Sequence, residues 1–454
     1  MAKYKAYPEY KDSEIEWLGK IPSGWLLKKA KYIFQRVQRP LRDIDGVVTA
    51  FRDGQVTLRT NRRTDGFTNS VKEIGYQGVR RNDLVIHAMD GFAGAIGVSD
   101  SDGKCSPVCS VCIPWKNQSV NMHFYGYLVR QLAVTDFILS LAKGIRERST
   151  EFRFSEFSGL MLAIPPIYEQ NQIATFLDHE TAKIDNLIEK QQQLIELLKE
   201  KRQAVISHAV TKGLNPDVPM KDSGVEWLGD VPEHWTIKPL RYLGDCQNGI
   251  NIGAEAFGSG FPFVSYGDAY KNRVLPDNGS GLVQSTTEDR RKYSLLRGDV
   301  LFTRTSETIE EIGFASACIK SIENACFAGF LIRFRPKSSD LCIEYSKYYF
   351  SNQLLRIFFT KEMNLITRAS LSQDLLKTMP VVIPPVDEQI KIAELLDNIS
   401  EKFDQLQLLG EEQIKYLQER RTALISAAVT GKIDVRDWIA PDTQDVEEPQ
   451  EATA

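Results

Sequence analysis

The chain has 454 residues, of which 42% are hydrophobic and 26% are charged, and its formal net charge is −4. This is a globular composition, and the length allows more than one domain of ordinary size. No apolar run approaches the 18 residues of a membrane helix and the N-terminus is polar, so we expect a cytoplasmic protein with no membrane contact. Reduced thiols are then the expected state of the seven cysteines.

The near-neutral total hides an uneven distribution of charge. Residues 20–164 hold 21 lysines and arginines against 13 aspartates and glutamates, a net of +8. Residues 231–382 have a net of +2, and residues 383–454 have a net of −9. We therefore predict a basic first domain and an acidic, disordered tail at 433–454.

A short segment near the N-terminus occurs twice. Lys11–Trp25 recurs as Lys221–Trp235, 210 residues later, and both copies contain Trp-Leu-Gly. The second copy follows directly on a long helical pattern, whereas the first would follow the second such pattern only if the chain were a circle. This permuted order predicts two units of one kind, related by a pseudo-twofold axis. We assign residues 1–19 and 214–230 to the two corresponding segments.

Each segment is followed by a β-rich domain, at 20–164 and at 231–382. Residues 47–60 alternate and turn at Asp53-Gly54, which predicts a hairpin. Arg81–Ile86 and Arg297–Phe302 have the same turn-then-strand pattern, and shorter helices are predicted at 124–142 and 343–361. Elsewhere the two domains differ. Variable domains beside repeated helices suggest that the domains select a ligand while the helices assemble a complex.

The first domain has an arginine-rich stretch that resembles a nucleic-acid surface. Eight arginines lie within residues 39–81, interleaved with Thr, Asn, Gln, Phe and Tyr. Arginine can bond guanine in two places, Asn and Gln can do so for adenine, and both basic residues bind phosphates. A solvated basic face is the alternative. The candidate DNA-binding residues are Arg52, Arg59, Arg62, Arg63, Arg80 and Arg81 in the first domain, and Gln247, Asn248, Asn251, Tyr266, Lys271, Arg273, Arg290 and Arg291 in the second.

Two long helices, at 165–213 and 383–432, are predicted behind the pairs Pro165-Pro166 and Pro384-Pro385. The copies align at a shift of 219 residues, and apolar residues recur at heptad spacing in both. Gly213 and Gly431 stand where C-terminal caps belong. The partner of each helix is either the other copy or a second chain. The helix positions predicted to support assembly are Leu177, Ile184, Leu187, Leu198, Leu396, Phe403, Leu406 and Leu417.

No catalytic motif is present. The chain lacks the G-x-x-x-x-G-K-[ST] phosphate loop, and both Pro-Pro pairs are preceded by Ile rather than by the Asn or Asp of a methyltransferase loop. Cys105, Cys109, Cys112 and His123 allow a zinc site, but no second cysteine pair stands at metal spacing. We expect no metal and no cofactor on this chain.

At this point the sequence resembles a known family, the DNA specificity subunits of type I restriction-modification enzymes. The resemblance covers nearly the whole chain and depends on the two Pro-Pro-x-x-Glu-Gln helices, the doubled Lys-Asp-Ser…Glu-Trp-Leu-Gly segments and the permuted order of two variable domains. Stretches from Gly66 to Val98 are also similar to target-recognition domains of that family.

The resemblance implies an α+β fold, with two mixed α/β target-recognition domains joined by two long antiparallel coiled-coil helices. It implies a non-catalytic subunit that binds double-stranded DNA at a bipartite, asymmetric site. Two adenine methyltransferase subunits using S-adenosylmethionine would assemble on it, with restriction subunits that need ATP and Mg. It also places DNA-facing loops after one strand of each domain, at His87, Met89 and Asp90 and at Thr303, Arg304 and Thr305.

Two other functions compete with this interpretation. A coiled-coil scaffold without nucleic acid is disfavoured by the arginine-rich stretch and by the divergence of the two domains. A stand-alone DNA-modifying enzyme is disfavoured by the missing motifs.

Overall fold

A computed structural model describes residues 4–62, 74–135, 137, 151–306, 312–362 and 369–440. Arg63, most of the predicted helix after Thr135 and the tail after Ala440 lie outside these ranges. The chain divides into two compact units, Met1–Gln191 with Glu412–Ala454 (unit 1) and Gln192–Glu411 (unit 2). Each unit contains one variable domain and one end of both long helices.

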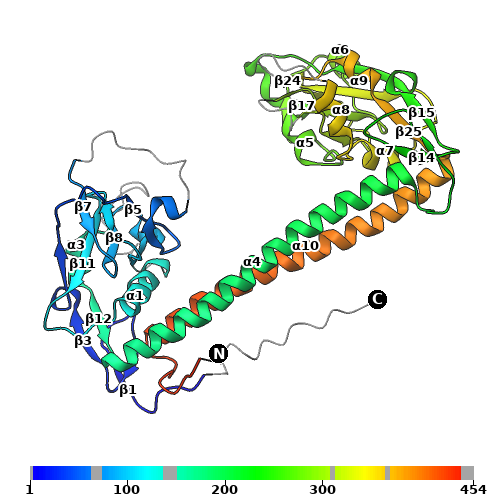
Figure 1. Cartoon of the computed structure of the whole chain (residues 1–454). Helices are drawn as coiled ribbons and strands as arrows, with labels where there is room; N and C mark the ends of the chain where they lie inside the picture. Colours follow the sequence, from blue (N-terminus) through cyan, green and yellow to red (C-terminus); the bar gives the residue numbers. More distant parts are fainter. Residues whose placement is uncertain are drawn as a thin grey trace. The chain divides into compact units, whose positions relative to one another are not determined.

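The long helices are α4 (Ile167–Lys212) and α10 (Val386–Val429), and they lie side by side within each unit (Figure 1). In unit 1, Ile173 and Leu177 near the start of α4 share an apolar core with Leu424 and Ile425 near the end of α10. In unit 2, Ile206 and Val210 of α4 share a core with Ile392 and Leu396 of α10. The helices are therefore antiparallel partners within one chain, which resolves the alternative of a second chain.

Of the eight helix positions predicted to support assembly, six are buried or half-buried and two are exposed. Leu177, Ile184, Leu396 and Leu417 are buried and Leu198 and Phe403 half-buried, but Leu187 and Leu406 are 45% and 49% exposed. A two-helix contact covers only a narrow stripe of each helix, and apolar residues beside that stripe stay in solvent. Leu187 and Leu406 correspond at the 219-residue shift, so both units leave the same place uncovered.

The Glu-Gln pair of each Pro-Pro motif holds the permuted segment and the domain to the helix. Glu169 accepts a hydrogen bond from Trp25 Nε1 at 2.8 Å, and Glu388 accepts one from Trp235 Nε1 at 2.9 Å. Gln170 Oε1 accepts from the backbone N of Asn121 at 2.9 Å, at the start of the first domain's helix. The corresponding bond in unit 2 joins Gln389 to Cys342 at 2.8 Å.

The N-terminal segment closes unit 1 as the permuted order predicted. Strand β1 (Tyr10–Asp12) pairs with β2 (Lys20–Pro22), and Tyr10 donates to the carbonyl of Gly431 at the end of α10 at 3.0 Å. In unit 2, β13 (Met220–Asp222) pairs with β14 (Asp230–Pro232) next to the end of α4. Gly431 and Gly213 both have positive φ, 72° and 81°, as their capping role requires.

A second strand pair joins the two ends of each domain. Strand β3 (Leu26–Lys29) pairs with β12 (Met161–Ile164) in unit 1, and β15 (Thr236–Pro239) pairs with β25 (Pro380–Ile383) in unit 2. Each of these pairs precedes a Pro-Pro motif directly, so the domain begins and ends at the start of its helix.

The domain of unit 1 is built on an antiparallel sheet. Its order is β4 (Phe34–Val37), β11 (Cys109–Pro114), β8 (Leu84–His87) and β9 (Ile96–Val98), and α1 (Met122–Val134) packs against it. Smaller pairs are formed by β7 (Gln77–Val79) with β10 (Gly103–Cys105) and by β5 (Val48–Ala50) with β6 (Val56–Leu58). The second of these is the hairpin predicted around Asp53-Gly54.

The domain of unit 2 repeats the sheet and helix. Strands β16 (Gly244–Asn248), β23 (Leu331–Pro336), β19 (Val300–Thr303) and β21 (Ala315–Ala317) have the corresponding order. The helix predicted at 343–361 is two helices, α7 (Ile343–Tyr349) and α8 (Leu355–Glu362). Buried Asn352 lies in the break, where its side chain accepts from Leu354 N at 3.0 Å and from Ser207 Oγ at 2.5 Å.

In unit 1, β5 pairs antiparallel with β6, and a parallel bridge from Val47 to Lys104 joins this hairpin to β10. The equivalent sheet of unit 2 is larger. It consists of β17 (Phe257–Val264) between β18 (Gly281–Val283) and β22 (Cys326–Phe327), with short helices α5 (Tyr266–Lys271) and α6 (Thr287–Lys292). This part has its own apolar core, which includes Phe263, Val283 and Phe327. Among the described residues, the two domains differ most around this smaller sheet, where unit 2 has a longer strand, β17, and adds α5 and α6.

Candidate nucleic-acid interface

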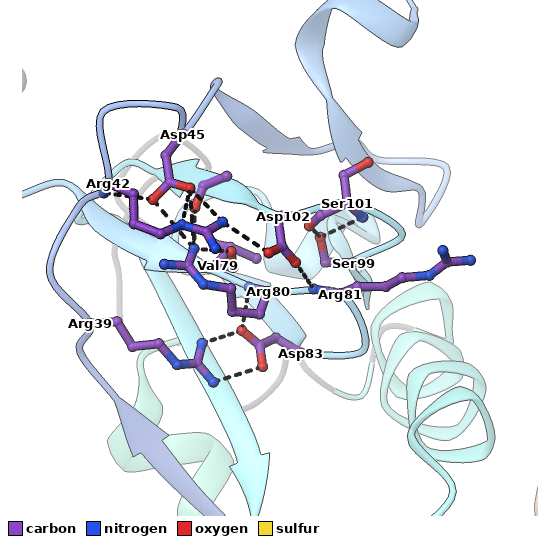
Figure 2. A network of polar contacts seen from close by, with 11 residues as sticks. Arg39, Arg42, Asp45, Val79, Arg80, Arg81, Asp83, Ser99, Ser101 and Asp102 are labelled. Atoms are coloured by element: carbon purple, nitrogen blue, oxygen red, sulfur yellow. Dashed lines mark hydrogen bonds and ion pairs between the residues drawn. The ribbon is translucent and has the colours of Figure 1, made fainter.

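Three arginines of the arginine-rich stretch form ion pairs with aspartates around the turn before β8. Asp45, whose side chain is fully buried, is bonded by Arg42 at 2.8 Å and by Arg80 at 3.4 Å, and Asp83 is bonded by Arg39 (Figure 2). Burial raises the pKa of Asp45, but the bonds from Arg42 and the charge of Arg80 outweigh burial, and the pKa lies below its ordinary value. These arginines stabilise the loop.

Arg80 and Arg81 are neighbours with different environments. The Arg80 guanidinium also donates to the carbonyls of Val79 and Gly103, at 2.7 and 3.2 Å, which gives it a structural role in this loop, while its DNA-binding role stays a prediction. Arg81 uses only its backbone N, which donates to Asp102 at 2.9 Å, and its side chain points away from the network (Figure 2). Amino-acid composition does not distinguish Arg80 from Arg81, because their environments depend on the direction in which each side chain leaves the turn.

The turn before β8 has an asparagine where the corresponding turn of the second domain has a glycine. Asn82 has a φ of 71° and the equivalent Gly298 a φ of 100°. Asn tolerates this left-handed conformation better than most residues, so the turn persists without glycine. The following aspartates correspond as well, since Asp83 pairs with Arg39 and Asp299 pairs with Arg335 at 2.6 Å.

The hairpin and the loop after β8 bring several candidates of the first domain together. Arg52, 69% exposed, pairs with Asp90 at 2.8 Å. The backbone N of Asp90 donates to His87 Nδ1 at 3.0 Å, and exposed Met89 lies between these two residues in the chain. Burial lowers the pKa of His87, against the opposing charge of Asp90. An Arg-Asp-His-Met cluster therefore forms from two separate segments.

The other described arginines of the hairpin are held by neighbouring side chains of the hairpin itself. Arg62 pairs with Asp53 at 2.7 Å and lies over the ring of Phe51 at 4.2 Å from its centroid. Arg59 donates to Thr49 Oγ1 at 3.3 Å. Arg63 lies outside the described residues.

In unit 2 the loop after β19 corrects the expectation for Thr303. Its side chain is fully buried, and its hydroxyl accepts from Phe314 N at 2.9 Å, so it supports the strand end. Arg304 is half-buried, and Thr305 belongs to the short strand β20 (Thr305–Ser306), which pairs with β24 (Ala369–Ser370). Only the latter two are placed to reach a ligand.

The remaining candidates of unit 2 divide in the same way. Gln247 accepts from buried Arg333 and is corrected to a structural residue, while Asn248 ends the paired strand β16. Tyr266 stacks on Tyr270, with ring centroids 5.8 Å apart, and Arg273 lies over Tyr348. The exposed candidates are Asn251, Lys271 and Arg291, the last of which pairs with Glu288 at 3.2 Å.

Aromatic residues missed in the sequence lie beside this group. Arg290 of α6 lies 3.6 Å from the ring centroid of Phe261, which is 37% exposed, and Phe257 of the same strand is 44% exposed. Arginine over an exposed ring is a surface suited to bases and phosphates. Gly258 and Gly260, both with positive φ, lie between these two phenylalanines at a register shift of β17, and they were the only sequence signal for this irregularity.

The described residues offer no metal centre. No group of three or more His, Cys, Asp and Glu in the described ranges could hold a metal ion. Cys105, Cys109 and Cys112 are free, buried thiols, and burial raises the pKa of Cys112 to about 12. The alternative of a zinc site at these cysteines is therefore abandoned. Of the helices described, none is long and apolar enough to cross a membrane.

Comparison with known proteins agrees with this architecture. The family model of the type I restriction modification DNA specificity domain matches residues 232–415. The chain is 24% identical to the type I restriction enzyme EcoKI specificity subunit of Escherichia coli K12, over 93% of this chain and 92% of that protein. It is 21% identical to the StySPI specificity subunit of Salmonella potsdam, with the same coverage.

Solved structures show the same fold. A chain from a type I R-M system, determined in work on complex assembly and conformational transition, matches with a TM-score of 0.64 at 16% identity, over 91% of this chain and 99% of that chain. The HsdS subunit of Thermoanaerobacter tengcongensis matches with a TM-score of 0.51 at 17% identity, over 91% and 98%. Over nearly its whole length the chain is similar to specificity subunits of type I restriction-modification enzymes, and the specificity-domain model matches its residues 232–415.

Proposed function

We propose that this chain is the non-catalytic subunit that gives a type I restriction-modification enzyme its DNA sequence specificity. The observation that carries the proposal is one helix-and-sheet framework, repeated in two units, that bears two divergent domains. Each domain would read one part of a bipartite site in double-stranded DNA. Because the domains differ, the two parts would differ and the whole site would be asymmetric.

The exposed cations suit such a role. Arg52, Arg62 and Arg81 of unit 1, and Lys271 and Arg291 of unit 2, lie at the surface of divergent elements or next to them. Cations at these places would neutralise phosphates and fix the register of the domain on the duplex, while neighbouring polar and aromatic side chains contact bases.

Partner binding is supported by a repeated apolar surface on the helices. Leu187 and Tyr416 are 45% and 63% exposed in unit 1, and their counterparts Leu406 and Leu197 are 49% and 61% exposed in unit 2. Two equivalent surfaces suit two copies of one partner, which we propose are adenine methyltransferase subunits. S-adenosylmethionine would bind those subunits, and ATP and Mg would bind restriction subunits. All of them would act in the cytoplasm, where the DNA is.

The proposal is tested by mapping N6-methyladenine across the genome of the source cell with and without this gene. Loss of methylation at one split, asymmetric motif, restored by the wild-type gene, is the expected result. Complementation with Leu187→Glu plus Leu406→Glu should fail, whereas Glu189→Gln on an unrelated helix face should succeed. An unchanged methylation map in a host with an active methyltransferase would contradict the proposal.

A further inference from the structure

Arg130 of unit 1 is a half-buried arginine without an ion-pair partner among the described residues. Arg130 leaves α1 toward a pocket of ≈ 260 Å³, whose other lining residues include Gly54, Tyr127 and Arg421. The side chain is half-buried and its Nε is fully enclosed without a hydrogen-bond partner. No hydrogen bond or ion pair joins its guanidinium to any residue in the described part of the chain.

This isolation distinguishes Arg130 from the structural arginines. Arg39, Arg42 and Arg80 each have an aspartate partner, and burying a cation without one is costly. Burial and the charge of Arg421 lower the pKa of Arg130, and they outweigh the opposing charges of Asp53 and Asp185. Asp53 also lines the pocket, but its carboxylate is paired with Arg62 at 2.7 Å. The site therefore has an excess of positive charge that an anion would relieve.

The hairpin turn is shaped around this side chain. Gly54 has a φ of 91°, and a Cβ there would lie 2.3 Å from Cδ and Nε of Arg130. Arg421 bonds Asp185 through Nε and Nη2, at 2.8 and 3.1 Å, so its Nη1 is not used in that pair. Two guanidinium groups therefore line one small pocket with donors available to a ligand.

Unit 2 has the same arrangement at the corresponding place. Arg202 pairs with Asp404 at 2.6 Å, as its counterpart Arg421 does with Asp185. Tyr348 donates to Asp397 at 2.6 Å, as its counterpart Tyr127 does to Asp178 at 2.8 Å.

A second domain arginine completes the pocket of unit 2. Arg273 lies over the ring of Tyr348, 5.1 Å from its centroid, and lines a pocket of ≈ 810 Å³ with Arg202. Nε of both arginines is buried without a partner in the described part of the chain. Glu196 and Glu200 line this larger pocket too, with Glu196 paired to Lys199 at 2.8 Å.

The two domain arginines come from unrelated positions. Arg130 belongs to α1, next to the Tyr127 of the same helix, whereas Arg273 follows α5, an element of the added part of unit 2. Packing alone does not explain why, in both units, an incompletely paired arginine lies beside the equivalent tyrosine and the equivalent helix arginine. A shared ligand does.

We propose that each unit binds one phosphate-class oxyanion between its domain arginine and its helix arginine, Arg130 with Arg421 in unit 1 and Arg273 with Arg202 in unit 2. The planar guanidinium fork matches such oxyanions, which accept two parallel hydrogen bonds. The source is either a backbone phosphate of DNA, which rests on the proposed function, or a free phosphate, which does not.

The first experiment measures thermal unfolding of the full-length chain in rising inorganic phosphate, with chloride at matched ionic strength as reference. Phosphate should raise the unfolding temperature of the wild type and of the control Arg241→Met, an exposed arginine with no place in either pocket. The double variant Arg130→Met plus Arg273→Met should lose this response. Arg130→Lys, which keeps the stem and the charge, guards against a folding defect and should keep part of the response.

The second experiment identifies the source, using the salt dependence of binding to a duplex of unrelated sequence. If DNA supplies the oxyanion, the double variant should reduce the slope of log K against log salt by about 2, at roughly 0.9 for each phosphate that the variant no longer neutralises. A phosphate response with an unchanged slope assigns the site to free phosphate and leaves the proposed function untouched. The proposal is overturned if phosphate stabilises the wild type no more than chloride does. It is also overturned if the methionine variants unfold at clearly lower temperature without phosphate, since the arginines would then be structural.

Discussion

Replacing Glu169 should damage unit 1 more than replacing its counterpart Glu388 damages unit 2. Glu169 is 4% exposed, and its Oε2 accepts from Trp25 Nε1 at 2.8 Å and from Tyr7 Oη at 2.9 Å. Glu388 accepts from Trp235 at 2.9 Å and from His234 at 2.6 Å, but its side chain is 35% exposed. The same motif position therefore has different burial in the two units.

The structure gives the magnitude. In Glu169→Ala, both Trp25 and Tyr7 keep a buried donor without an acceptor, and each such donor costs about 1–3 kcal/mol, so a loss of about 2–6 kcal/mol is expected. In Glu388→Ala only Trp235 is left in this state, because water can replace the acceptor of exposed His234, and the loss should be about 1–2 kcal/mol.

Native-state amide exchange can measure both units in one chain. Protection should fall in β3 and β12 for Glu169→Ala, and in β15 and β25 by a smaller amount for Glu388→Ala. Glu169→Gln, which keeps one acceptor, should lie between the wild type and Glu169→Ala. Equal losses in the two units, or a larger loss in unit 2, would refute the argument from burial.

Three further predictions concern single positions. Gly431→Ala should cost about 1–3 kcal/mol in urea unfolding because a Cβ at φ 72° would lie 2.4 Å from Pro22 Cδ, whereas Gly24→Ala, with nothing within 4 Å, should be nearly neutral. Arg80→Ala should lower stability by about 1–3 kcal/mol through its lost hydrogen bonds. Arg81→Ala should instead leave stability within about 0.5 kcal/mol and reduce the salt slope of DNA binding by about 1; equal stability losses would show that both arginines are structural. His87 should titrate below 6.5 by NMR because burial disfavours its charged form, so its contribution to stability is present above that pH and is lost as pH falls through the folded pKa; a value at or above 6.5 would contradict this.

The repeat was the most informative part of the sequence because its residues recur in one register and make the same contacts in both units. The Glu-Gln pair, the tryptophan of the permuted segment and the closing glycine recur at fixed shifts, and each makes the same contact in both units. A motif that forms the same contacts twice can be recognised from spacing alone. The hairpin at Asp53-Gly54 was predictable for a different reason, because a turn is specified by adjacent residues.

Tertiary structure decided which side chains reach solvent. Arg80 and Arg81 are adjacent in sequence, yet only Arg80 is used by Asp45, a residue 35 positions away. Leu187 and Leu406 fit the apolar pattern of the helices, but both are exposed. The facing helix covers only a narrow stripe, and these two residues lie beside it. Arg130 and Arg273 share no sequence position, and only the packing of each domain on its helix places them at equivalent pockets. The sequence alone thus determined the repeat and indicated the resemblance to specificity subunits, whereas the exposure and the pairing of the arginines depend on long-range packing, which no local pattern encodes.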